Sequence, residues 1–190
     1  MNKRIAIFAS GAGSNAENII RYFADNQEFE FPIIISSKEN AYVHQRAKKL
    51  GVKSFTLEFK EYLDWEVLHD ILIWQQIDYV ILAGFLLKIP PLILELFPQK
   101  IINIHPALLP KFGGKGMYGS RVHRAVCAAG ETETGITIHY VTENYDEGNI
   151  IFQAKCRIAP DDTPEIVAQK VHALEYEWFP KIIEQTINNS

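Results

Sequence analysis

Two polar side chains end an apolar run in the segment from Lys100 to Pro106. Asn103 and His105 are two residues apart, so in an extended strand their side chains point to the same face. An asparagine amide donates a hydrogen bond to a developing oxyanion, and a histidine exchanges protons near neutral pH. The alternative is a polar pair satisfied within a loop. We interpret Asn103 and His105 as a candidate catalytic pair.

A second candidate is the glycine-containing loop Ser10 to Asn15 (SGAGSN), which follows the first predicted strand. Its glycines let the backbone approach a ligand, and the following helix offers free amides to an anion. We expect Ser14 or Asn15 to cap that helix. The loop is neither a Walker loop nor a full dinucleotide fingerprint, and no convincing acidic residue follows the second strand, so NAD is not expected. The alternative is a tight turn, but its place after the first strand favours phosphate binding.

Alternating strands and helices must position these groups. Strands are predicted over residues 4–10, 31–36, 53–56, 79–82 and 100–104, and helices over 15–24, 42–50 and 64–75. This order is typical of an α/β, Rossmann-like fold with a mostly parallel sheet flanked by helices. Ligands bind such sheets beyond the carboxyl ends of the strands, which is where both candidate motifs stand.

The second half of the chain predicts an antiparallel C-terminal extension of the sheet. Residues 135–141 alternate like a half-exposed strand, and residues 150–158 can pair with them. Thr163 is suited to cap a final helix, with Pro164 at its first position. An apolar stripe follows at helical spacing: Val167, Val171, Leu174 and Trp178. We expect one domain over residues 1–190.

The overall composition excludes several classes of protein. Of 190 residues, 47% are hydrophobic and 22% charged, which is typical of a soluble globular protein. No apolar run is long enough to span a bilayer or to serve as a signal peptide, so we expect a cytoplasmic protein without a membrane partner. The net charge is −4 and the sequence contains no block of like charges, which argues against nucleic-acid binding.

Metal binding is also not expected. The two cysteines, Cys127 and Cys156, lie far apart and outside any ligand spacing, as reduced thiols of a cytoplasmic protein would. The histidines at positions 44, 69, 139 and 172 show no metal-ligand spacing either, and we interpret them as structural.

Three ordered motifs resemble those of the folate-dependent formyltransferases. They are Ser10 to Asn15, Leu82 to Phe85 (LAGF) and Asn103 to Pro110 (NIHPALLP), and Asp146 in the sequence YDEG matches the acidic residue of that family's catalytic trio. The resemblance covers nearly the whole chain. The first motif is similar to that of members acting on glycinamide ribonucleotide. It implies transfer of a formyl group from the cosubstrate 10-formyltetrahydrofolate to the amine of 5'-phosphoribosylglycinamide in purine biosynthesis, without a metal.

The resemblance also implies roles for individual residues. Asn103 would stabilise the tetrahedral oxyanion, His105 would donate a proton, and Asp146 would orient His105 and raise its pKa. Glu175 would meet the substrate amine, although a solvated helix residue is the alternative. The substrate phosphate would lie on the backbone of Gly13, Ser14 and Asn15. The expected folate-binding residues are Lys60, Leu86, Leu87, Lys88, Ile89, Asn103, Val141 and Tyr145.

The sequence departs from the family's pattern in two places. The basic residue usual directly after Gly-Phe-Met is displaced here to Lys88, so its role is shifted or lost. The segment from Lys111 to Val122 is longer than usual and holds four glycines, which predicts a mobile flap, with an inert surface loop as the alternative. His123 would help to close the site or merely begin a helix, and His172 would border the substrate.

Several other functions stay open. A formyltetrahydrofolate deformylase carries an N-terminal regulatory domain, whereas this chain begins at the first predicted strand. A methionyl-tRNA formyltransferase adds an RNA-binding domain, and a sugar-nucleotide N-formyltransferase needs a nucleotide site that the sequence does not offer. A non-catalytic module that binds a phosphorylated metabolite is a further alternative. We expect small-molecule substrates and either a monomer or a homodimer.

Overall fold

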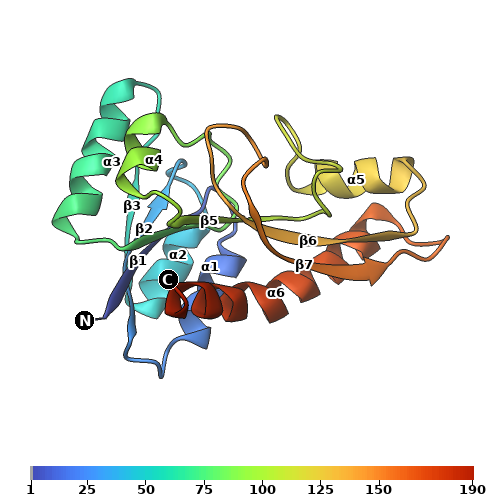
Figure 1. The fold of residues 1–190 in the computed structure, drawn as a ribbon, viewed down its shortest axis with the longest axis horizontal. Coiled ribbons are helices and arrows are strands. Elements are labelled where there is room, and N and C mark those ends of the chain that lie inside the picture. Colours follow the sequence, from blue (N-terminus) through green and yellow to red (C-terminus); the bar gives the residue numbers. More distant parts are fainter. Residues whose placement is uncertain (1) are drawn as a thin grey trace. The chain divides into compact units, whose positions relative to one another are not determined.

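The computed structural model describes residues 2–190, whose contacts group into two compact units that meet between Ile102 and Asn103. The seven strands follow the order β3-β2-β1-β4-β5-β6-β7, a mostly parallel sheet with antiparallel C-terminal strands (Figure 1). The predicted fold class is therefore confirmed. The expectation of one domain stays a prediction.

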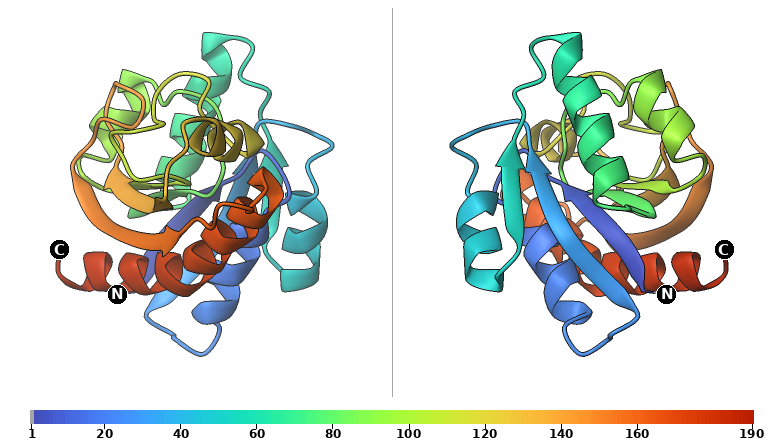
Figure 2. Two further views of the ribbon diagram at one scale, coloured as in Figure 1. Left: turned by 90° about the vertical axis from the view of Figure 1, so that its right-hand side faces the viewer. Right: turned by 90° about the vertical axis from the view of Figure 1, so that its left-hand side faces the viewer.

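The first unit alternates strands and helices as the sequence predicts. β1 is central: Ile7 lies opposite Ile34 of β2 and Ile81 of β4, in parallel pairing, and all three are buried. Figure 2 shows α1 and α2 on one face of these strands and α3 and α4 on the other. The elements are β1 (Lys3–Phe8), α1 (Ser14–Tyr22), β2 (Phe29–Ser36), α2 (Val43–Leu50), β3 (Lys53–Thr56), α3 (Tyr62–Trp74), β4 (Tyr79–Leu82) and α4 (Pro91–Leu96).

The cap of α1 differs from the prediction. Gly13 is the N-cap residue, in the left-handed conformation with φ of 72°, and no side chain caps the helix. Neither Ser14 nor Asn15 occupies the cap position, because the chain enters α1 through this left-handed turn and both residues already lie inside the helix.

The second unit is built around the predicted antiparallel pair. β5 (Ile101–His105) runs into it, and β6 (Glu133–Tyr140) pairs with β7 (Ile150–Arg157). α4 was not predicted, and the alternative of a helix beginning at His123 corresponds to α5 (Ser120–Ala128), which begins three residues earlier. α6 (Pro164–Asn188) begins as expected, with the Thr163 hydroxyl accepting from the amide of Ile166. In Figure 1, α6 runs along β6 and β7.

Two expectations about burial in this unit are wrong in part. β6 is not half-exposed: every residue from Thr134 to His139 is buried, because α6 packs against the strand and the segment after β5 hydrogen-bonds to it. On α6, Val167 and Val171 are buried as predicted, but Leu174 and Trp178 are half-buried. The fully inward positions continue at four-residue spacing through Glu175 and Phe179.

Candidate active site

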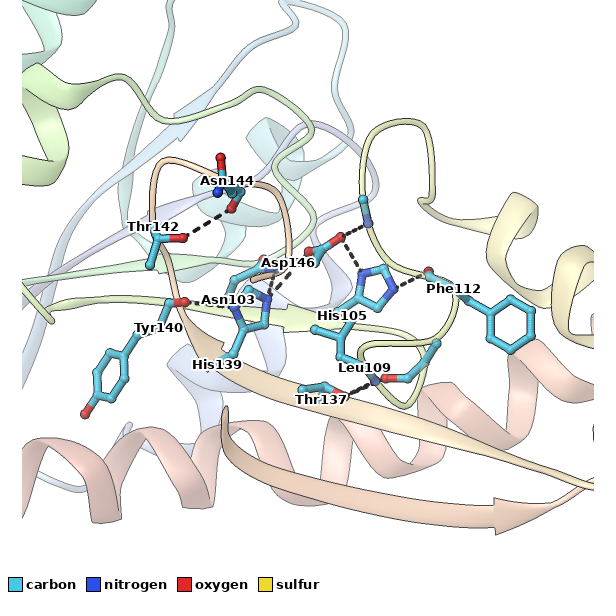
Figure 3. Close-up of polar contacts among 12 residues, drawn as sticks. Asn103, His105, Leu109, Phe112, Thr137, His139, Tyr140, Thr142, Asn144 and Asp146 are labelled. Carbon is cyan, nitrogen blue, oxygen red and sulfur yellow. Dashed lines mark hydrogen bonds and ion pairs between the residues drawn. The ribbon is translucent and has the colours of Figure 1, made fainter. Parts of the chain in front are cut away.

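The carboxyl end of β5 supplies the two residues that the sequence singles out. Asn103 is half-buried and His105 is buried, and both side chains contact groups carried by the chain between β5 and β7 (Figure 3). Asp146 lies in the loop between β6 and β7, so the fold brings the predicted trio together within the second unit.

His105 has each ring nitrogen beside a protein acceptor. Nε2 lies 2.8 Å from the Phe112 carbonyl oxygen. A carbonyl only accepts, so Nε2 carries a proton and donates it. Nδ1 faces Oδ2 of Asp146 at 3.5 Å. In the neutral ring Nδ1 is therefore unprotonated, and it is the atom at which a second proton is gained or lost next to a carboxylate.

Asp146 is held from three sides. The backbone N–H of Gly114 donates to Oδ2 at 2.8 Å, and Oδ1 lies 3.6 Å from Nε2 of His139. Burial pushes the pKa of Asp146 upward, but the two imidazoles and the Gly114 amide outweigh it and hold the pKa below its ordinary value. Asp146 is therefore an anion at neutral pH, as a partner for a protonated His105 must be.

The expected rise in the pKa of His105 is not what the structure gives. Burial lowers the pKa of His105, and the opposing pulls of Asp146 and of the Phe112 carbonyl are not large enough to reverse it. Asp146 thus acts in the expected direction and raises the pKa of His105. His105 is only 3% exposed, however, and the loss of hydration lowers its pKa by more than the carboxylate raises it.

His139 is a site residue that the sequence analysis missed. Its Nδ1 lies 2.8 Å from the Tyr140 carbonyl oxygen and its Nε2 lies 3.0 Å from Nδ2 of Asn103. Its lack of metal-ligand spacing favours a structural role when the sequence is considered alone. The available signal was strand alternation, since Thr137 and His139 are two residues apart and share a face of β6.

Thr137 fixes the turn that follows His105. Its buried hydroxyl donates to the Ala107 carbonyl at 2.7 Å and accepts from the Leu109 amide at 3.0 Å. Gln153 of β7 adds a third hydrogen bond, from Nε2 at 2.8 Å. This side chain also escaped the sequence analysis, and it ties the loop after β5 to the β6–β7 pair.

The glycine-rich segment after the trio's motif contributes backbone atoms rather than side chains to the site. Phe112 and Gly114 supply the carbonyl and the amide that bind His105 and Asp146, while Phe112 and Met117 pack on a buried cluster that includes Val122. An alanine Cβ at Gly113 would lie 2.5 Å from a methyl carbon of the Leu109 side chain. The segment is therefore not an inert surface loop, and its mobility stays a prediction.

Three further polar side chains lie on α5 and α6. Glu175 is buried, and its carboxylate accepts from Nδ1 of His172 at 2.9 Å, which raises the pKa of His172. His123 lies inside α5 and is buried, and its Nδ1 has no hydrogen-bond partner. Burial lowers the pKa of His123, and the charge of Glu175 pulls the pKa values of His123 and His105 upward.

The predicted phosphate loop belongs to the first unit and is braced by α2. The amide of Val43 donates to the Gly11 carbonyl at 3.2 Å, and Nε of Arg46 donates to the Ala12 carbonyl at 2.9 Å. Arg46 also pairs with Glu17 of α1. A Cβ at Gly13 would lie 2.4 Å from a methyl carbon of Val43. Only glycine fits there, and the loop backbone is fixed at the amino end of α1, where helix amides favour an anion.

Apart from Asn103 on β5, the predicted folate-binding residues lie in three loops. Leu86 follows β4 and its amide donates to the Ser10 hydroxyl at 3.4 Å, whereas the Ile89 side chain is buried in the core and only its backbone is available to a ligand. Lys60 precedes α3 and pairs with Glu58. The others follow β4 or β6: Leu87 and Lys88 in the first unit, and Val141 and Tyr145 in the second.

Over residues 2–190 the side chains form no group of three or more histidine, cysteine, aspartate or glutamate residues suited to a metal ion. In the same range no helix is long and apolar enough to cross a membrane.

Comparison with known proteins defines the class of protein. The formyl transferase family model matches residues 3–183, and the chain belongs to this family. It is thus an enzyme of the formyltransferase class, as the motifs predict.

Individual relatives sharpen the comparison. The phosphoribosylglycinamide formyltransferase of Bacillus subtilis is 36% identical over 190 residues, covering 97% of this chain and 95% of that protein. The chloroplastic phosphoribosylglycinamide formyltransferase of Arabidopsis thaliana is 36% identical over 187 residues, covering 95% of this chain and 64% of that protein. Among solved structures, the phosphoribosylglycinamide formyltransferase of Bacillus halodurans has a TM-score of 0.88 and 35% identity, covering 97% of this chain and 95% of the other.

Proposed function

We propose that this enzyme transfers the formyl group of 10-formyltetrahydrofolate to the amine of 5'-phosphoribosylglycinamide, a step of purine biosynthesis. Relatives named for this activity are similar to the chain over nearly its whole length. The observation that carries the proposal is the arrangement of Asn103, His105 and Asp146, in which an oxyanion donor stands beside an imidazole with one proton-exchanging nitrogen next to a carboxylate.

Asn103 serves the addition step. The substrate amine bonds to the formyl carbon, and the carbonyl oxygen becomes an oxyanion. The bond from that carbon to the folate nitrogen then breaks. An N–H of the Asn103 amide donates to the oxyanion, and loss of one such donor typically costs about 100- to 1000-fold in rate.

His105 and Asp146 serve the proton balance. The attacking amine gives up one proton and the departing folate nitrogen takes one. His105 holds a proton at Nδ1 in the intermediate, because its Nε2–H is already committed to the Phe112 carbonyl. The Asp146 carboxylate stabilises the imidazolium at 3.5 Å, and a water completes the route between the two substrate nitrogens.

The remaining residues bind the substrates. The substrate phosphate lies at the amides of Gly13, Ser14 and Asn15, where the amino end of α1 is electropositive. The buried Glu175 carboxylate accepts a hydrogen bond from the substrate amine. The folate contacts Lys60, Leu86, Leu87, Lys88, Ile89, Asn103, Val141 and Tyr145.

The test is release of tetrahydrofolate from 10-formyltetrahydrofolate, with and without 5'-phosphoribosylglycinamide. We expect release only when the ribonucleotide is present, and its loss in His105→Ala. Release without the ribonucleotide would identify a deformylase, and formylation of a different amine would identify another N-formyltransferase. Absence of release from every mixture, with retained binding of the phosphorylated substrate, would support a binding module.

A further inference from the structure

We propose that His139 is a positioning residue of this enzyme, which fixes the direction in which the Asn103 amide presents its N–H groups. The inference rests on the proposed function, in which Asn103 is the oxyanion donor. It adds a residue outside the catalytic trio, whose nearest side-chain contact in the site is with Asn103 at 3.0 Å.

The hydrogen bonds of His139 define one tautomer. The Tyr140 carbonyl accepts at 2.8 Å from Nδ1, so the proton of the neutral ring is on Nδ1. Nε2 then carries a lone pair, and at 3.0 Å it accepts from the Asn103 amide. Nε2 lies closer to the amide nitrogen of Asn103, at 3.0 Å, than to Oδ1 of Asp146, at 3.6 Å, so its nearer partner is Asn103.

This contact decides which end of the amide meets the substrate. An asparagine side chain has a donating NH₂ and an accepting oxygen, and without a partner it exchanges them by rotation. Figure 3 shows the Asn103 amide in contact with the His139 ring. With one N–H of Asn103 held by His139, the second N–H is directed away from the ring and is available to the oxyanion. The rotated amide would present oxygen lone pairs to a negative charge, which opposes the reaction.

The backbone around His139 is built to keep the ring still. His139 is 2% exposed, and β6 is buried from Thr134 to His139. The Tyr140 amide donates to the Asn149 carbonyl at 3.0 Å. At Gly148, an alanine Cβ would lie 1.7 Å from the Tyr140 carbonyl oxygen, so that only glycine permits this closure of the loop. The carbonyl that sets the tautomer is thus itself fixed.

The first test compares two variants by steady-state kinetics. His139→Leu removes the acceptor, and we expect kcat to fall about 10-fold with KM for both substrates within about two-fold, since one hydrogen bond is lost. His139→Gln keeps an accepting oxygen near the position of Nε2, and we expect it to recover most of that loss. A glutamine variant as impaired as the leucine variant would overturn the proposal.

A double-mutant cycle separates positioning from general damage. Once Asn103→Ala has removed the amide, His139→Leu should cost less than about two-fold, because the two residues act as one unit. An undiminished 10-fold loss in that background would show that His139 acts elsewhere. Wild-type enzyme without ribonucleotide-dependent transfer would contradict the proposed function instead.

A spectroscopic readout tests the contact without turnover. In ¹⁵N-labelled ligand-free protein, the side-chain amide protons of Asn103 are identified by their loss in Asn103→Ala. We expect the downfield shift of the bonded proton to disappear in His139→Leu and to be retained in His139→Gln. An amide pair that does not move in His139→Leu would contradict the proposal, whatever the kinetics show.

Discussion

Replacing the Asp146 carboxylate by an amide tests the proton relay. Asp146→Asn keeps the side-chain shape and removes the charge 3.5 Å from Nδ1 of His105. At an effective dielectric constant of about 20, unit charges at that separation interact by about 5 kcal/mol, which sets a ceiling on the effect. The carboxylate also interacts with His139, so only part of this energy acts on His105. We therefore expect a loss in kcat below the ceiling, of about 100- to 1000-fold.

Initial rates of ribonucleotide-dependent folate release measure the effect as separate kcat and KM values. The carboxylate raises the pKa of His105 against burial, so the limb of the pH–rate profile that reports His105 should move to lower pH in Asp146→Asn. Glu143→Gln removes the same charge from an exposed position in the same loop, and we expect its kcat to change less than two-fold by comparison. A loss below about five-fold in Asp146→Asn, or an unmoved limb, would refute the assigned role.

Three further predictions concern binding and stability. Gly13→Ala should lower the free energy of unfolding by at least about 2 kcal/mol and raise KM for the ribonucleotide, because the new Cβ meets Val43 and position 13 has a left-handed conformation. In Gly11→Ala the new Cβ meets nothing within 4 Å, so the free energy of unfolding should change by less than about 0.5 kcal/mol. Urea denaturation measures both values. Thr137→Val should cost about 3 kcal/mol, because it leaves buried backbone groups unsatisfied, and Thr137→Ser should restore the lost stability. Burial lowers the pKa of His123, so the contribution of His123 to stability is complete above about pH 6.5 and is lost as the pH falls. A hydrogen bond to Glu175 raises the pKa of His172, so the contribution of His172 is complete below about pH 6.5 and is lost as the pH rises. Glutamine at each position should flatten the pH dependence of unfolding on the corresponding side, and an unchanged curve would contradict the assignment.

Local sequence patterns predict much of the fold. Buried parallel strands are short apolar runs, so the prediction over residues 79–82 matches β4 residue for residue. The prediction over residues 53–56 matches β3 equally well, although β3 is an edge strand with exposed and half-buried side chains. The Thr163-Pro164 pair marks the start of α6, because a hydroxyl cap followed by proline suits only a helix beginning. The α1 cap was missed because a glycine in a left-handed turn replaces side-chain capping, and that choice depends on contact with α2.

The site residues that stand at strand ends or in motifs could be predicted from the sequence. The residues that join the site only through tertiary contacts could not. Asn103 and His105 stand out as polar groups closing an apolar strand. His139 was overlooked because its partner Asn103 is 36 residues away in the sequence. Strand alternation assigns His139 to a face of β6 but does not identify that partner. The lowered pKa of His105 depends on burial that a strand-end position does not disclose. The Phe112 and Gly114 contacts use backbone atoms, which carry no residue-type signal at all.

The most direct test of the account follows the formyl carbon itself. Enzyme, 10-formyltetrahydrofolate labelled with ¹³C in the formyl group, and 5'-phosphoribosylglycinamide are mixed, and the labelled products are identified by NMR. We predict that the label appears as a formamide on the glycinamide nitrogen with wild-type enzyme and that this product is absent with His105→Ala. Label recovered as free formate, or formylated ribonucleotide formed equally by His105→Ala, would contradict the account.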